Sequence, residues 1–188
     1  MKHQSLKRIC AAALGIALFV ALSVCLQVPV YQNYYLCLGY AAVAVYCCCM
    51  GPLAGAAVGS VGVVLYCLLT GGMRGMPGWA LGNVVIGAGL GWSFSVGSRL
   101  RAKPARILLP AAGAVVFTAL GILGVKSLAD SLIRAQPFPV RLGMNVSAFA
   151  ADAAVLLLSL PLCAAVEPLA ARLLPKHDRK EKASYAEP

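Results

Sequence analysis

The sequence predicts an all-α polytopic membrane protein, a compact bundle of six transmembrane helices. Of its 188 residues, 61% are hydrophobic and only 12% are charged, and the mean hydropathy is +0.83. A soluble domain carries about a quarter of its residues as charged side chains. The apolar residues form long runs, and about 20 helical residues are enough to cross a bilayer. Basic residues stand between these runs, where a membrane protein places them.

Six apolar runs define the expected spans, which cover approximately residues 9–28, 35–50, 52–70, 78–96, 107–125 and 143–166. The second and third runs are continuous, and we divide them at Gly51-Pro52 because proline removes a backbone donor and restricts the residue before it. Residues 1–172 are therefore expected to form one transmembrane domain. Residues 173–188 are expected to form a disordered cytoplasmic tail.

The distribution of positive charge orients the bundle. A cytoplasmic N-terminus leaves only Arg74, Lys126, Arg134 and Arg141 of the 16 Lys and Arg residues outside. The positive-inside rule favours this arrangement, which places both termini in the cytoplasm and the protein in the plasma membrane, in contact with lipid. The net charge of +10 does not indicate a nucleic-acid partner, because the basic residues neither interleave with aromatic residues nor form a stripe.

The sequence contains no catalytic or metal-binding constellation. No predicted span holds a histidine, a pair of carboxylates or a Gly-x-Ser-x-Gly elbow, and the ATP-binding pattern GxxxxGK[ST] does not occur. The eight cysteines lie in or beside apolar runs without a CxxC pair, so we interpret them as small apolar residues. We therefore expect neither an enzyme nor a metal or other cofactor.

Small residues recur at every fourth position in three of the spans. They are Ala13, Ala17 and Ala21 in the first span, Gly51, Gly55 and Gly59 in the third, and Asn83, Gly87 and Gly91 in the fourth. This spacing lets helix backbones approach closely in lipid. For the third and fourth spans we expect packing within the monomer. For the first span, packing within the monomer and docking of another membrane subunit both stay open.

A few polar residues are candidates for a ligand site at the outer to middle depth of the bundle. Asp152 is the only acidic residue deep in a span, and no basic residue lies at comparable depth to pair with it. Asn145 lies two turns earlier on nearly the same helix face. Asn83 and Trp79 belong to the fourth span, and Arg74 to the outer segment before it. We expect these residues to line one pocket; the alternative is that they hydrogen-bond one another between helices.

Three stretches resemble the S components of energy-coupling-factor (ECF) vitamin importers. They are SLKRICAAALGIALFVALSV at residues 5–24, GPLAGAAVG at 51–59 and GMPGWALGNVVIGAGLG at 75–91. The resemblance implies high-affinity binding of a vitamin or related micronutrient from the outer side. It also implies partnership with a transmembrane coupling subunit and cytoplasmic ATPase subunits, with the alanine stripe of the first helix docking on the coupling subunit. A stand-alone secondary transporter or a non-catalytic membrane assembly factor are the alternatives.

The charge distribution predicts that residue 74 lies outside the cell and residue 103 inside. On a cysteine-free background, a cysteine at each position should react with a membrane-impermeant thiol reagent from opposite sides of the membrane. Labelling of both positions from the same side would contradict the topology.

Overall fold

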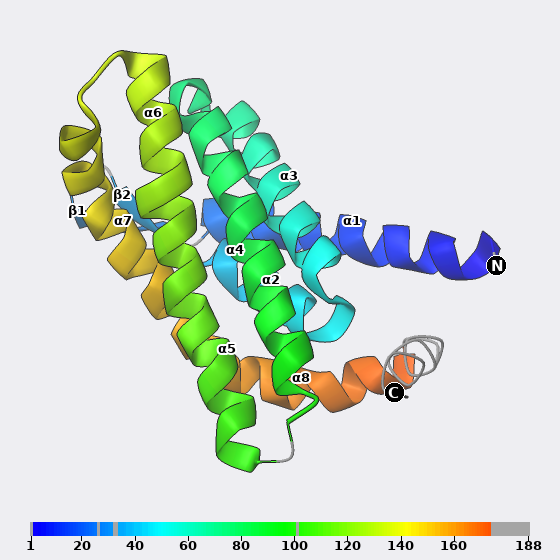
Figure 1. Ribbon diagram of the computed structural model, residues 1–188. Coiled ribbons are helices and arrows are strands. Elements are labelled where there is room, and N and C mark those ends of the chain that lie inside the picture. The colour runs from blue at the N-terminus through cyan, green and yellow to red at the C-terminus, as the bar shows by residue number, and fades with distance from the viewer. Residues whose placement is uncertain (1, 26, 32–33, 101, 174–188) are drawn as a thin grey trace.

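A computed structural model of the protein describes residues 2–25, 27–31, 34–100 and 102–173, and these are mostly helical (Figure 1). The elements in order are α1 (Lys2–Cys25), β1 (Gln27–Tyr31), β2 (Tyr34–Cys37), α2 (Gly39–Met50), α3 (Pro52–Thr70), the 3-10 turn η1 (Met73–Gly75), α4 (Met76–Gly97), α5 (Lys103–Thr118), the π-helix η2 (Ala119–Lys126), α6 (Ser127–Arg134), α7 (Phe138–Leu158) and α8 (Leu160–Leu173). The predicted helical membrane bundle is confirmed. The predicted tail, apart from its first residue, lies outside the described residues.

Within the described residues, five helical stretches are long and apolar enough to span a membrane. They are Leu6–Cys25, Pro52–Thr70, Met76–Gly97, Pro104–Arg134 and Phe138–Leu158. The predicted count of six spans is therefore approximate. The fifth predicted span, at residues 107–125, is extended at both ends because α5, η2 and α6 follow one another without a break.

The second predicted span, residues 35–50, differs most from the structure. Its first residues belong to β2, which pairs antiparallel with β1 in a two-stranded hairpin. The remainder forms α2, whose 12 residues extend only about 18 Å at 1.5 Å per residue. That length is short of the roughly 30 Å hydrocarbon core. Periodicity did not reveal this break, because the run is apolar throughout.

The last predicted span, residues 143–166, is divided between two helices. α7 begins at Phe138, earlier than predicted, and α8 begins at Leu160 after a break at Ser159. Pro161 explains the break, because proline lacks an N–H and its ring clashes with the preceding turn of a continuous helix.

The turn between α2 and α3 falls where the sequence analysis placed it. Gly51 has φ +87°, a conformation that favours glycine, and Pro52 follows as the first residue of α3. Gly71, with φ +75°, ends the same helix in the left-handed conformation. These two glycines therefore set both ends of α3 and the length of its crossing.

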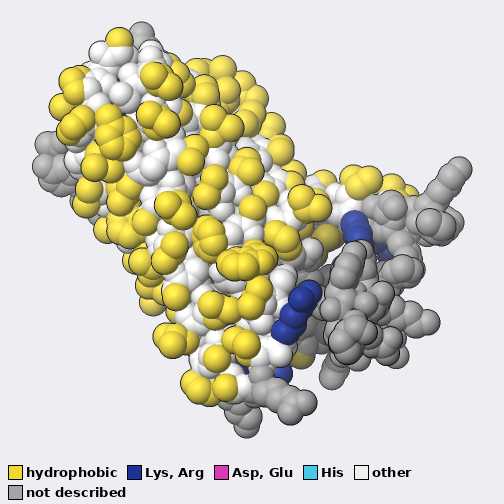
Figure 2. Space-filling model, viewed as in Figure 1, with side chains coloured by type: hydrophobic (Ala, Val, Ile, Leu, Met, Phe, Trp, Pro, Cys, Tyr) yellow, Lys and Arg dark blue, Asp and Glu magenta, His cyan; other side chains and the backbone are white. Residues whose placement is uncertain are grey.

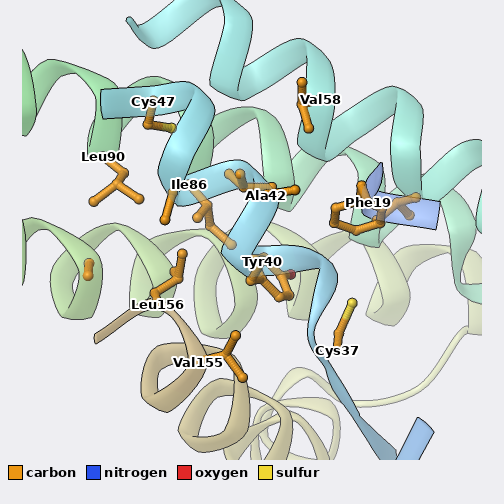
Figure 3. Close-up of a cluster of buried hydrophobic side chains, with 14 of the residues drawn as sticks. Phe19, Cys37, Tyr40, Ala42, Cys47, Val58, Ile86, Leu90, Val155 and Leu156 are labelled. Carbon is orange, nitrogen blue, oxygen red and sulfur yellow. The ribbon is translucent and has the colours of Figure 1, made fainter. Parts of the chain in front are cut away.

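In Figure 1, α3, α4 and the long α5–η2–α6 element lie side by side, and α7 crosses them toward α8. The N-terminal part of α1 and the end of α8 project on the same side of the bundle. The short helix α2 is enclosed, since it packs against α1, α3, α4, α7 and α8. Tyr40, Ala42 and Cys47 of α2 are almost completely buried in the core (Figure 3).

The surface of the bundle matches a lipid environment. Large apolar side chains such as Leu53, Leu132 and Leu158 are at least three-quarters exposed to the surroundings. Figure 2 shows hydrophobic side chains spread over the whole visible face of the bundle, with the basic side chains gathered on one side. A soluble protein rarely exposes so large a continuous apolar surface. The arrangement is that of a multi-pass membrane protein.

α3 and α4 pack through their glycines, as predicted for the third and fourth spans. A Cβ atom added to Gly87 would lie 2.5 Å from the Gly55 carbonyl carbon, and one added to Gly91 would lie 2.5 Å from the Pro52 Cα. The Cys47 thiol of α2 donates to the Gly87 carbonyl at 3.2 Å. The close approach of the two backbones therefore holds α2, α3 and α4 together.

Gly87→Ala should destabilise the protein by about 1–3 kcal/mol, because the new methyl group meets backbone atoms that are unable to rotate away. Gly143→Ala is the matched control, since a Cβ there meets nothing within 4 Å. The control should be neutral or stabilising by up to about 1 kcal/mol. Thermal unfolding in detergent measures both; equal midpoints for the two variants would contradict the close approach of α3 and α4.

Candidate functional site

The first part of the candidate site is a hydrogen-bond network that joins α2, α3 and α4. The buried Tyr40 hydroxyl donates to Asn83 Oδ1 at 2.7 Å and accepts a hydrogen bond from Trp79 Nε1 at 3.0 Å. Asn83 Nδ2 donates to the Gly59 carbonyl oxygen at 3.2 Å. Asn83 is only 1% exposed, so these bonds satisfy a side chain that has no access to water.

Aromatic rings border this network. The Trp79 indole meets the Tyr66 ring of α3 edge to face, with centroids 5.7 Å apart. The Tyr40 ring packs edge to face against Phe19 of α1 at 6.2 Å. Figure 3 shows Tyr40 at the start of α2, among core side chains that include Val155 and Phe19. The polar groups are thus held between flat apolar surfaces.

A second network joins η2, α6 and α7. The Lys126 ammonium donates to Asn145 Oδ1 at 3.0 Å, and Asn145 Nδ2 donates to the Ser127 hydroxyl at 2.9 Å. The Ser127 hydroxyl in turn donates to the Ile122 carbonyl oxygen at 3.0 Å. Asn145 is 2% exposed and Ser127 is fully buried, so this part of the site is also enclosed.

The π-helix η2 places Lys126 inside the bundle. A Cβ atom added to Gly82 of α4 would lie 2.6 Å from the Gly121 carbonyl oxygen, and the reverse contact is equally close. The backbone of η2 therefore lies directly against α4. π-helical segments are rare and occur frequently at functional sites. Lys126 is the last residue of this segment; its side chain is half-buried, and its ammonium reaches Asn145 of α7.

Asp152 of α7 connects the two networks. Asp152 is 5% exposed, and the Tyr40 hydroxyl and the Lys126 ammonium both lie near enough to its carboxylate to influence it electrostatically. The expectation that no cation reaches Asp152 is therefore wrong. Lys126 lies just beyond the predicted fifth span. The helix continues past this residue, and the long side chain of Lys126 extends inward. A buried carboxylate beside a cation and a hydroxyl is far less costly than an isolated one.

Four of the five predicted ligand-site residues, Trp79, Asn83, Asn145 and Asp152, belong to these two networks. The fifth, Arg74, lies in η1, and its side chain is outside the described residues. The two asparagines do not bond to each other. Each bonds instead to a residue that the sequence analysis had not selected for the site.

Tyr40 and Lys126 are the site residues that sequence reasoning missed. A tyrosine in an apolar run is indistinguishable from a membrane-interface anchor, so Tyr40 carried no separate signal. Lys126 did carry one. Leu128 and Leu132 repeat at helical spacing after it, which indicates that the helix continues and that Lys126 is not at its end.

The predicted docking stripe lies on the outer face of α1. Ala13, Ala17 and Ala21 are all exposed. The opposite face of α1 carries Phe19, which is fully buried, and Gly15, whose added Cβ would lie 2.8 Å from Val58. The stripe is thus not used for packing α1 onto α3.

A cavity of about 520 Å³ lies at the other end of the bundle from these networks. Its lining includes the C-terminal residues of α2 and α4, the start of α5 and one face of α8. The ionisable side chains of the lining are Cys48, Cys49, Arg99, Arg106, Cys163 and Glu167. This cavity shares no residue with the Asp152 site, so the bundle has a distinct polar feature at each end.

Together, the helical fold and the enclosed site define a polytopic membrane protein with a polar centre inside one end of its bundle. A sequence model of the family described as "ECF-type riboflavin transporter, S component" matches residues 3–167. The chain belongs to this family. It is therefore a vitamin-binding S subunit of a membrane transporter, and the resemblance seen in the sequence is confirmed.

Proposed function

We propose that this chain binds riboflavin with high affinity from the outer side of the plasma membrane, in the site around Asp152. The observation that carries the proposal is the meeting of two hydrogen-bond networks at one buried carboxylate beside Trp79. Ligand sites combine apolar and aromatic walls with a few placed polar groups, and this region has both. The family match supplies the vitamin class.

The chemistry of riboflavin suits these side chains. Its isoalloxazine ring system is flat and aromatic, and it suits the walls formed by Trp79 and Tyr66. One edge of the ring alternates carbonyl acceptors with an N–H donor. The amides of Asn83 and Asn145 offer both a donor and an acceptor, and Asp152 accepts from an N–H group. Arg74, before α4, is proposed to contribute at the outer mouth of the site.

The polar groups of the site are bonded to one another. The Tyr40 hydroxyl donates to Asn83 Oδ1 at 2.7 Å, and the Lys126 ammonium donates to Asn145 Oδ1 at 3.0 Å. A ligand that binds between these groups has to exchange some of these bonds for its own. This exchange favours a ligand that matches the pattern of donors and acceptors over one that only fills the space.

We also propose that the subunit works with a transmembrane coupling subunit and cytoplasmic ATPases. The exposed alanine stripe of α1 supports this, because small residues let a second membrane helix approach closely. The positive-inside rule supports cytoplasmic termini, with the Asp152 site toward the outer face and the 520 Å³ cavity toward the cytoplasm. In this scheme the chain has no catalytic role, and ATP hydrolysis belongs to the partners.

The proposal is tested by purifying the protein in detergent and identifying retained small molecules by mass spectrometry. Riboflavin should be released from the denatured protein, and the emptied protein should bind added riboflavin in a fluorescence titration. Co-purification of ATPase subunits should accompany mild extraction from the native membrane. Absence of both retained and added flavin from the folded protein would overturn the proposal.

Asp152→Asn should weaken riboflavin binding by roughly tenfold to a hundredfold, because a hydrogen bond to a charged group contributes about 1.5–3 kcal/mol. Asn145→Ala should weaken it as well. Glu167→Gln is the matched control, since it neutralises a carboxylate in the cavity at the other end of the bundle. Calorimetry measures all three. If both site variants bound riboflavin as tightly as the parent, the role of Asp152 and Asn145 would be purely structural.

Ala17→Trp should separate ligand binding from transport. The isolated variant should bind riboflavin as the parent does, whereas uptake into cells and co-purification with the coupling subunit should fall strongly. Leu108→Trp is the control, because Leu108 is 70% exposed on α5, away from the stripe. Unchanged uptake by the Ala17 variant at equal expression would show that the stripe is not the docking surface.

A further inference from the structure

The cavity at the end of the bundle opposite Asp152 is a space that the proposed function does not use. It has a volume of about 520 Å³ and lies between the ends of α2 and α4, the start of α5 and one face of α8. α8 packs against α2 and also contacts α5, so it borders this space on one side (Figure 1). Small-molecule sites have volumes of about 300–1,000 Å³. The cavity is therefore large enough to hold a ligand.

The charged groups of the cavity favour an anion. Its described lining contains the guanidinium groups of Arg99 and Arg106 and the carboxylate of Glu167. Two positive groups and one negative group leave an excess of one positive charge. A cavity lined in this way attracts a ligand that carries one negative charge more strongly than a neutral one.

Arg106 is oriented by the connection between α4 and α5. Its Nε atom donates to the Leu100 carbonyl oxygen at 2.8 Å, and this is the one hydrogen bond that its guanidinium makes within the described residues. The two Nη groups can therefore donate to a ligand. The planar donors of a guanidinium match the oxygens of a phosphate group. Arg99 lies on the same connection, two residues after α4 ends, so the cavity has two such groups.

The apolar part of the lining continues onto the outer surface of the bundle. Phe94, Ile107 and Leu160 line the cavity. Ile107 is 69% exposed, and the neighbouring Leu108 is 70% exposed, so one wall of the cavity leads onto the lipid-facing surface of α5. A ligand that joins a phosphate group to hydrocarbon chains suits both parts: the phosphate lies at the arginines, and the chains lie along this apolar surface.

The cavity also lies at the depth of lipid headgroups. The spans Met76–Gly97 and Pro104–Arg134 meet at this end of the bundle, and Arg99 and Arg106 lie where they meet. The positive-inside rule assigns this end to the cytoplasmic face. The lipids of that leaflet carry negative charge, and basic pockets between transmembrane helices on that side bind anionic headgroups.

We propose that this cavity binds one anionic phospholipid, with the phosphodiester group at Arg99 and Arg106 and the acyl chains along α5. The single charge of the phosphodiester balances the excess positive charge of the lining. Glu167 accepts a hydrogen bond from a headgroup hydroxyl, as phosphatidylglycerol offers, and opposes a phosphate group of higher charge. A choline headgroup has no N–H or O–H donor and neutralises its own phosphate. The inference does not depend on which ligand binds at Asp152.

The test is a titration of the full-length protein in neutral detergent with phosphatidylglycerol or phosphatidylcholine, followed by native mass spectrometry. One phosphatidylglycerol should bind, at least about tenfold more tightly than phosphatidylcholine, because a hydrogen bond to a charged group contributes roughly that factor. Equal affinities for the two lipids would overturn the proposal, and this comparison needs no variant.

The double variant Arg99→Gln/Arg106→Gln should lose most of the preference for phosphatidylglycerol, with an affinity about a hundredfold lower because two such bonds are removed. Lys7→Gln is the matched control, since Lys7 is an exposed basic residue of α1 outside the cavity lining. It should weaken binding by less than about fivefold, the general attraction of one basic residue for an anionic lipid. Equal losses in the double variant and the control would overturn the cavity as the binding site.

Inorganic phosphate distinguishes a lipid site from a site for a small anion. Added in excess over the lipid, it should leave the bound phosphatidylglycerol in place, because it lacks the hydrocarbon chains and carries more charge beside Glu167. Displacement of the lipid by inorganic phosphate would overturn the assignment to a phospholipid.

Discussion

The rest of the candidate site depends on the placement of the buried Asp152 carboxylate between Tyr40 and Lys126. In hydrocarbon no water is present to solvate a charge, so the protein has to bring a hydroxyl and a cation to it. Those two groups come from α2 and η2, elements that are far apart in the sequence. Packing the helices so that both side chains reach α7 is therefore a condition of folding as well as of the proposed binding.

Close contacts at glycines bring the helices together at two positions in the bundle. Gly55 and Gly87 bring α3 and α4 together and enclose α2, which carries Tyr40. Gly82 and Gly121 bring η2 against α4 and turn Lys126 inward. Larger side chains at these positions would separate the helices and widen the distance between Asp152 and its partners. The regular spacing of small residues in the sequence thus sets the helix packing, and this packing positions the side chains of the polar centre.

The sequence predicted the membrane class, most of the spans and the α2–α3 turn, and four of the residues that it selected belong to the two hydrogen-bond networks. It did not reveal that residues 35–50 are divided between a strand and a short helix, because a run apolar on all faces has no period to read. The position of Lys126 was missed for a different reason. A lysine after an apolar run is normally a flanking residue, and only a π-helical segment with a continuing helix brings it inside. Contacts between residues far apart in the chain could not be predicted from a single sequence, whereas local patterns could.

The continuous helix Pro104–Arg134 has 31 residues, which corresponds to about 46 Å at 1.5 Å per residue. That length exceeds the roughly 30 Å hydrocarbon core, so the helix has to tilt or extend into the headgroup layer. Since α6 carries Asp130 and Arg134, its polar end belongs at the boundary between lipid tails and headgroups. The depth of Lys126 is consequently tied to the thickness of the surrounding bilayer. The lipid composition of the host membrane becomes a physical parameter of the site, alongside its side chains.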